Sequence, residues 1–224
     1  MADVSVVIPV FDGERFLGDA LAAVAAQTHP ACETVVVLDG PAEGCAGIAT
    51  AAGARVLARS ARGGVAAARN AGVAVARGEL IAFLDQDDLW HPDKLARQVR
   101  RMAALPPVDI VRCAKRIVLA PGAAAPGWLP LGWERAQMPA YGPSAWLVRR
   151  PALERVGPFD EELEVSSDAD WLARAADLGL CSATLPDVLV NWRIHDRNAS
   201  HDQAAMDREK LAVLRRSVAR KRCA

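Results

Sequence analysis

The sequence has little of several features that mark specialised classes of protein. Its 224 residues include only five cysteines, which are scattered and form no CxxC pair or Cys/His cluster. This pattern predicts reduced thiols in a cytoplasmic protein and argues against a structural zinc site. The opening residues MADVSVVIPVF place no basic stretch before a long apolar run, so we expect no signal peptide. No window reaches the roughly 18 uninterrupted apolar residues of a membrane-spanning helix.

The chain also lacks an excess of charge of either sign. It carries 27 Lys and Arg against 27 Asp and Glu, so its formal net charge is zero. Because proteins that hold nucleic acid usually need a basic surplus, we expect no nucleic-acid partner. Hydrophobic residues make up 52% and charged residues 24% of the chain. This composition excludes a disordered chain and predicts one globular domain with a substantial core.

Apolar runs and helix-like segments alternate along the first half of the chain. Residues 4–10 form a β-branched run that is typical of a strand buried on both faces. The predicted order is strand 4–10, helix 17–27, strand 34–38, helix 42–52, strand 55–58, helix 64–76 and strand 80–84. This order predicts right-handed βαβ units, and therefore a Rossmann-type α/β domain with a mostly parallel central sheet flanked by helices.

The second half of the chain is less regular. A predicted helix over 92–104 is followed by short apolar stretches and by a segment at 120–143 that is rich in Pro, Gly and Ala. A segment of that length inside a compact domain is usually functional or mobile. We interpret Trp146 and Trp171 as core residues, since a tryptophan is more often packed than exposed.

Three carboxylates directly follow the predicted strand at 80–84, in the sequence LIAFLDQDDLW. Ligands of parallel sheets bind beyond the carboxyl ends of the strands, so this position favours function. Crowding of Asp85, Asp87 and Asp88 raises carboxylate pKa values, and a hard divalent cation relieves it. The alternative is that Asp87 or Asp88 only caps the following helix.

Four segments of the chain, within residues 3–200, resemble the family 2 glycosyltransferases of the GT-A fold. They are SVVIPVFDGERFLGDALAAVAAQTHP, AAARNAGVAVARGELIAFLDQDD with the DxD motif, PSAWLVRRPALERVGPFDEEL, and DADWLARAADLG. The resemblance implies a GT-A-like domain over 1–206, with a nucleotide-sugar-binding half at 1–105 and an acceptor-binding half at 106–206. Residues 207–224 then form a basic C-terminal helix.

The resemblance also implies which residues contact a nucleotide-sugar donor, expected to be a UDP-sugar. The donor-side positions are Pro9, Val10, Asp12, Asp39, Arg69, Asp85 and Gln86. Asp39 matches an acidic residue that accepts hydrogen bonds from the base or the ribose. Its family neighbours are replaced by Leu38 and Pro41, which leaves the base preference open. Without the resemblance, Asp39-Gly40 could equally be a simple turn.

The resemblance implies a catalytic Mn²⁺ or Mg²⁺ ion that stabilises the leaving diphosphate. Asp87 is the preferred ligand and Asp88 supports it. His195, in NWRIHDRNAS, matches a downstream histidine that contacts the diphosphate or completes the metal shell. The alternative for a lone loop histidine is a structural role.

An inverting transfer also needs a base to take the proton of the acceptor. The family often carries Glu-Asp at the start of the acceptor-side helix, and the matching pair here is Ser167-Asp168. Asp168 is the first candidate for the base and Asp170 the second. The alternative is a capping box, in which Ser167 and Asp170 only begin the helix.

These expectations combine into a metal-dependent inverting glycosyltransferase. It would transfer a sugar to a glycan, a lipid-linked saccharide or a peptide. The alternative is a degenerate protein that binds a nucleotide-sugar without transferring it. Two interpretations of the basic tail stay open, namely peripheral contact with the inner face of a membrane, and packing on the body or on a second subunit.

Overall fold

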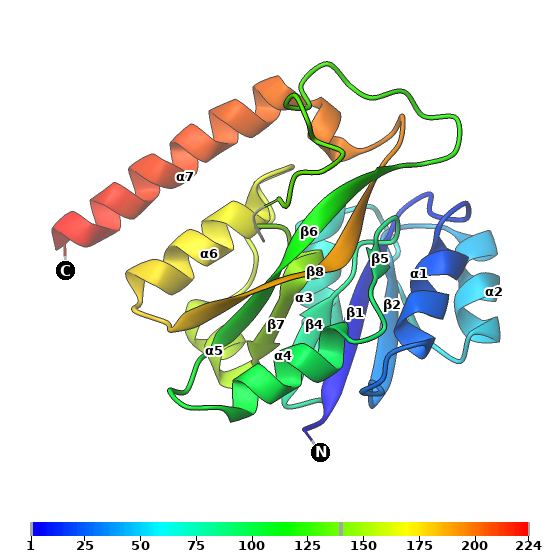
Figure 1. Ribbon diagram of the computed structural model, residues 1–224, viewed down its shortest axis with the longest axis horizontal. Coiled ribbons are helices and arrows are strands. Elements are labelled where there is room, and N and C mark those ends of the chain that lie inside the picture. The colour runs from blue at the N-terminus through cyan, green and yellow to red at the C-terminus, as the bar shows by residue number, and fades with distance from the viewer. Residues whose placement is uncertain (1, 139–140, 224) are drawn as a thin grey trace.

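The computed structural model describes residues 2–138 and 141–223, and within them eight strands form one mixed sheet (Figure 1). The strand order across the sheet is β3-β2-β1-β4-β7-β6-β8-β5. The strands are β1 (Val4–Val10), β2 (Glu33–Leu38), β3 (Arg55–Ala58), β4 (Leu80–Phe83), β5 (Leu89–Trp90), β6 (Ile110–Leu119), β7 (Trp146–Arg149) and β8 (Ser182–Ile194). The helices are α1 (Leu17–Ala25), α2 (Glu43–Ala51), α3 (Gly64–Val75), α4 (Lys94–Ala103), α5 (Arg150–Val156), α6 (Ser167–Asp177) and α7 (Gln203–Cys223).

The first half of the chain folds as the predicted βαβ units. Strand β1 pairs in parallel with β2 and with β4, and β2 pairs in parallel with β3. All seven residues of β1 are buried, as its continuous apolar run predicts. Helix α3 packs closely against β1 at Gly72. A Cβ added to Gly72 would lie only 2.3 Å from Cγ1 of Val7, so this contact leaves no room for a side chain.

The expectation of a mostly parallel sheet is wrong. Strand β7 is antiparallel to both of its neighbours, β4 and β6, and β5 is antiparallel to β8. Strands β6 and β7 follow one another in the chain, and the described residues between them form no α-helix. Neighbouring strands joined in that way run in opposite directions, whereas parallel neighbours need a crossover.

The remaining differences concern element boundaries. The two short apolar stretches expected near 110 and 117 belong to one ten-residue strand, β6. Helix α7 begins at Gln203, before the expected 207, because Oδ1 of Asp202 accepts a hydrogen bond from the N–H of Ala205 at 2.8 Å. The last residue of the predicted helix, Ala224, lies outside the described residues. Trp146 and Trp171 are fully buried, which confirms the prediction that they belong to the core.

Helices cover the sheet, and the last helix lies outside another helix. Figure 1 shows α7 running along the outer side of α6, away from the sheet. In the part of the chain that the structure describes, we find no helix with the length and apolar character needed to cross a lipid bilayer.

Candidate active site

The carboxyl ends of β2, β1 and β4 meet at one edge of the sheet, as the parallel pairing requires. Asp39, Asp12 and Asp85 follow these three strands and therefore come to the same edge. Pro9 and Val10 are buried within the last residues of β1, and the carbonyl of Val10 accepts a hydrogen bond from the N–H of Asp39 at 2.8 Å. The strand-end positions singled out in the sequence are thus brought together.

Gln86 joins the end of β1 to the turn formed by residues Asp85–Asp88, which we call the acidic turn. Its Oε1 accepts the N–H of Phe11 at 2.9 Å, and its Nε2 donates to the carbonyl of Phe11 at 2.8 Å. Gly13 is needed beside this contact, since a Cβ there would lie 2.2 Å from Oε1 of Gln86. Asp12 adopts a positive φ of 51° and forms an ion pair with Arg197. Gln86 therefore fixes the acidic turn against the strand end.

Asp39 is buried, and its carboxylate organises the start of α3. Oδ1 accepts hydrogen bonds from Arg59 and from the N–H of Gly63 at 2.9 Å, and Oδ2 accepts the N–H of Gly64 at 2.7 Å. A carboxylate at a helix N-terminus is stabilised by the helix dipole. The guanidinium of Arg62 lies 3.9 Å from the centre of the exposed Phe11 ring. The edge near Asp39 thus carries a cation and an aromatic ring.

Arg69 connects α3 to the acidic turn. Its Nη2 donates to Oδ1 of Asp85 at 2.7 Å, and the residue is only 4% exposed. Its Nε is buried without a hydrogen-bond partner in the described part of the chain. The N–H of Asp85 donates to the hydroxyl of Ser144 at 3.0 Å. The acidic turn is therefore held from α3 and from the segment that precedes β7.

His195 and Asn198 hold the carboxylate of Asp87. Oδ2 of Asp87 lies 2.9 Å from Nε2 of His195 and accepts a hydrogen bond from Nδ2 of Asn198 at 3.1 Å. Nδ1 of His195 accepts the N–H of Arg197 at 3.2 Å. A neutral imidazole that accepts at Nδ1 carries its proton on Nε2, so His195 donates to Asp87.

Asp88 points inward from the acidic turn. Its Oδ1 accepts the N–H of Arg193 at 3.1 Å, and the residue is 4% exposed. Burial raises the pKa of Asp88 well above its ordinary value, and the charges of Asp87 and Asp85 raise it further. By contrast, the side chains of Asp85 and Asp87 are 32% and 18% exposed.

Asp168 comes from a distant part of the chain to the same cluster. It lies at the start of α6, and its Oδ1 accepts the N–H of Ala169 at 2.8 Å. Burial raises the pKa of Asp168, and Asp85 raises it further, whereas Arg69 and Lys115 oppose the shift. The first candidate for the base therefore lies within electrostatic range of the acidic turn and of two cations.

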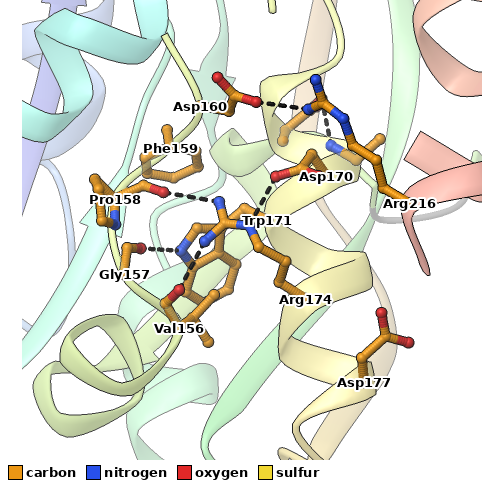
Figure 2. Close-up of polar contacts among 12 residues, drawn as sticks. Val156, Gly157, Pro158, Phe159, Asp160, Asp170, Trp171, Arg174, Asp177 and Arg216 are labelled. Carbon is orange, nitrogen blue, oxygen red and sulfur yellow. Dashed lines mark hydrogen bonds and ion pairs between the residues drawn. The ribbon is translucent and has the colours of Figure 1, made fainter. Parts of the chain in front are cut away.

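Asp170 lies apart from this cluster. It is 2% exposed, and its Oδ2 accepts a hydrogen bond from Nε of Arg174 at 2.7 Å (Figure 2). The N-cap of α6 is Ser166, whose side chain makes no capping hydrogen bond, so the alternative of a capping box that begins at Ser167 is wrong. The second candidate for the base is thus part of the packing between α6 and the segment after α5.

No three His, Cys, Asp or Glu side chains of residues 2–138 and 141–223 converge as a complete metal site. The partly exposed carboxylates of Asp85 and Asp87 nevertheless suit a hard divalent cation, which prefers carboxylate ligands and commonly takes others from phosphate or water. The acidic turn and Asp168 together contribute four carboxyl groups, whereas Arg69 and Lys115 contribute two cations. The cluster therefore fits a cation that takes its remaining ligands from a bound substrate.

The profile described as "Glycosyl transferase family 2" matches residues 5–157. The chain belongs to glycosyltransferase family 2. It is 30% identical over 222 residues to an uncharacterized glycosyltransferase of Nostoc sp., a match that covers 90% of this chain and 67% of that protein. The transferase class follows from this membership and not from the fold alone.

Two solved structures share the fold of this family 2 glycosyltransferase. One is a mannosyltransferase from Pyrobaculum calidifontis in complex with GDP-Man and Mn²⁺, with a TM-score of 0.76 and 21% identity. The other is S. aureus TarS 1-349 in complex with UDP-GlcNAc, with a TM-score of 0.77 and 19% identity. Each match covers 97% of this chain and 66% of the other. Matches to two rickettsial relatives cover only 34% of those proteins.

Sequence reasoning missed some residues of this glycosyltransferase site. Nζ of Lys115, on β6, lies 3.8 Å from the centre of the Trp192 ring and interacts with Asp88, Asp168 and Asp85. Its position in the stretch IVRCAKRIVL gave no clear signal, because Arg112 and Arg116 lie close by in the same stretch. Ser144 and Asn198 gave no signal, since their roles depend on contacts across the fold.

Proposed function

We propose that this family 2 glycosyltransferase is a metal-dependent inverting enzyme that uses a nucleotide-diphosphate sugar, with UDP as the nucleotide. The observation that carries the proposal is the cluster of Asp85, Asp87, Asp88 and Asp168 around only two cations. In that setting a carboxyl group must stay protonated, or a divalent ion must enter. Burial is the main cause of the raised pKa of Asp88, and the charges of Asp87 and Asp85 raise it further.

Asp87 would hold the ion, and the partly exposed carboxylate of Asp85 would be the second group able to reach it. Asp88 and His195 would support these two carboxylates from the protein side, because Asp88 faces inward and His195 donates to Asp87. When bound, a divalent cation neutralises charge on the leaving diphosphate. The Mn²⁺ in the Pyrobaculum mannosyltransferase supports this assignment.

The donor would occupy the edge formed by β1, β2 and β4, within residues 1–105. The Phe11 ring and the Arg62 guanidinium offer faces for stacking of a base. Asp39 retains lone pairs beyond the three hydrogen bonds it accepts, and a carboxylate can accept uracil N3–H or ribose hydroxyls. The buried Nε of Arg69 has no acceptor in the described part of the chain, and an oxygen of a bound ligand would supply one.

Asp168 would be the general base, at an acceptor site formed by residues 106–206. As it takes the proton of the acceptor hydroxyl, that oxygen bonds to the anomeric carbon. The bond from this carbon to the diphosphate oxygen breaks on the opposite side, and the nucleoside diphosphate leaves with the electron pair. Trp128 and Trp192, with ring centres 5.9 Å apart, offer flat surfaces for a sugar of a glycan, lipid-linked or peptide acceptor.

The proposal is tested by thermal unfolding with UDP-sugars and GDP-sugars, with and without Mn²⁺. A true donor stabilises the folded state by mass action, by about 2.7 kcal/mol at a concentration of 100 times its Kd. We expect a UDP-sugar to raise the midpoint in the presence of Mn²⁺ and to release sugar slowly. Saturable binding without any release would favour the degenerate binding protein, and no Mn²⁺ effect would contradict metal dependence.

We propose further that α7 contacts an anionic membrane surface. Its outer face carries Leu211, Leu214 and Val218, which are 49%, 62% and 50% exposed. Four exposed cations lie along the same helix without an ion pair in the described part of the chain, namely Arg208, Lys210, Arg215 and Arg222. Exposed apolar residues flanked by cations are typical of helices at an anionic lipid surface.

Sedimentation with vesicles tests this second proposal. We expect several-fold more protein to sediment with vesicles containing phosphatidylglycerol than with phosphatidylcholine alone, and less at high salt, since salt screens exposed charges. Leu214→Ser should weaken the binding, whereas Leu131→Ser, at an exposed leucine outside α7, should not. Equal sedimentation with both vesicles would contradict the proposal, and a dimer detected by light scattering without lipid would favour self-association.

A further inference from the structure

Glu209 of α7 makes an unusual set of contacts with the segment that leads into α6. Its Oε1 accepts the N–H of Glu164 at 2.9 Å, and its Oε2 accepts the N–H groups of Val165 at 3.0 Å and Ser166 at 2.8 Å. One carboxylate therefore binds three successive backbone donors. Such charge-assisted bonds are about twice as strong as neutral ones.

These three N–H groups lie at the start of α6, where the side chain of the N-cap residue makes no capping hydrogen bond. The backbone donors at a helix start need partners from outside the helix. Ser166 is the N-cap, yet its side chain makes no capping hydrogen bond, and its Oγ is buried without a partner in the described part of the chain. Glu209 instead binds the three N–H groups of residues 164–166, which lead directly into the helix, and places a negative charge near the positive end of the α6 dipole.

Asp168 follows Ser166 by two residues, so its position depends on where the helix begins. The N–H of Asp170 donates to the carbonyl of Ser166 at 3.0 Å, which closes the first turn around Asp168. The hydrogen bond from the N–H of Ala169 then orients the Asp168 carboxylate within that turn. A shift of residues 164–166 would therefore move Asp168 relative to Asp85 and Lys115.

Other contacts hold α6 at Arg174, which also binds Asp170 of the first turn, and at its far end. Figure 2 shows Arg174 donating to the carbonyls of Val156 and Pro158, and Arg216 of α7 reaching Asp160 in the segment between α5 and α6. Both Arg174 bonds are 2.7 Å long. At the far end of α6, Nε of Arg220 donates to Oδ2 of Asp177 at 2.8 Å. Without Glu209, α6 would keep its contacts through Arg174 and Asp177. Residues 164–166, which lead into its first turn, would lose their partner on α7.

We propose that Glu209 is a positioning residue, which holds the first turn of α6 so that Asp168 faces the acidic turn. This inference rests on the proposed role of Asp168 as the base. It assigns to the last helix a part in catalysis, from a residue more than forty positions away in the sequence.

The test compares three variants, Glu209→Ala, Glu209→Gln and Arg220→Ala. Misplacing a reacting group by about 1 Å can cost on the order of 10²-fold in rate. We therefore expect Glu209→Ala to lower kcat by about 10- to 100-fold while the donor Kd, measured by titration, changes less than about twofold. Glu209→Gln keeps the side-chain length and one acceptor oxygen, so its kcat should lie between wild type and Glu209→Ala.

Arg220→Ala is the matched control, because it removes an α7 contact at the other end of α6. We expect it to lower the midpoint of thermal unfolding and to leave kcat within about twofold of wild type. If Glu209→Ala does not fold, Glu209→Gln carries the comparison. Wild-type kcat in the Glu209 variants, or an equal loss in Arg220→Ala, would overturn the proposal. These results are read beside Asp168→Asn, since an active Asp168→Asn would refute the base itself and not the role of Glu209 alone.

Discussion

Asp168→Asn is expected to lower kcat by about 10²- to 10⁴-fold, the usual contribution of a general base. The amide cannot take the proton of the acceptor but has nearly the same size, so the donor Kd should stay unchanged. The base works only when deprotonated. Because the pKa of Asp168 is raised, chiefly by burial, wild-type kcat should fall as the pH falls through that raised value. Asp168→Asn should lose this acidic limb.

Asp170→Asn is the control for the base. It removes the buried negative charge that pairs with Nε of Arg174, so we expect a loss of about 1–3 kcal/mol in the free energy of unfolding. Its kcat should remain close to that of wild type, because Asp170 lies in the packing around Arg174. Near-wild-type turnover in Asp168→Asn together with a large loss in Asp170→Asn would transfer the role of base to Asp170.

Asp87→Ala is expected to abolish the response to Mn²⁺ and to lower kcat on the order of 10³-fold, since a catalytic cation supplies several kcal/mol of charge stabilisation. His195→Ala should have a smaller effect. It leaves the Asp87 carboxylate in place but removes the donor at 2.9 Å, and loss of such a supporting residue costs about 10- to 100-fold in metal affinity or activity.

The measurement is turnover as a function of Mn²⁺ concentration, with EDTA as the metal-free reference. The concentration of half-maximal activity should rise in His195→Ala, and the saturated rate should be largely retained. An Asp87→Ala enzyme that responds to Mn²⁺ as wild type does would rule out Asp87 as the metal ligand. A larger loss in His195→Ala than in Asp87→Ala would favour direct ligation by His195.

Much of the fold was predictable because its first half follows local rules. The buried run of β1 and the alternation of strands and helices dictate parallel pairing, and parallel pairing brings Asp12, Asp39 and Asp85 to one edge. The direction of β7 was not predictable from its own four residues. It depends on how the segment 120–143 returns the chain to the sheet.

The site was predictable where chemistry follows a strand end and unpredictable where it depends on distant packing. The acidic turn was visible in the sequence as three carboxylates after an apolar run. Lys115 reaches the acidic turn and Asp168 from β6, and Glu209 reaches the start of α6 from α7. Both contacts depend on packing between distant parts of the chain. Likewise, only the fold shows that Asp39 binds the N–H groups of Gly63 and Gly64.

The pairing of β5 with β8 bears on the order in which the nascent chain gains activity. Strand β5 closes the acidic turn, and its residues Leu89 and Trp90 pair with Asn191 and Val190, about a hundred residues later. Contacts this distant in sequence form late, whereas the local βαβ units can form during synthesis. The acidic turn therefore gains its contacts with Arg193, His195 and Asn198 only after β8 has been synthesised. A nascent chain should therefore fold its donor-binding half, residues 1–105, well before it can transfer a sugar.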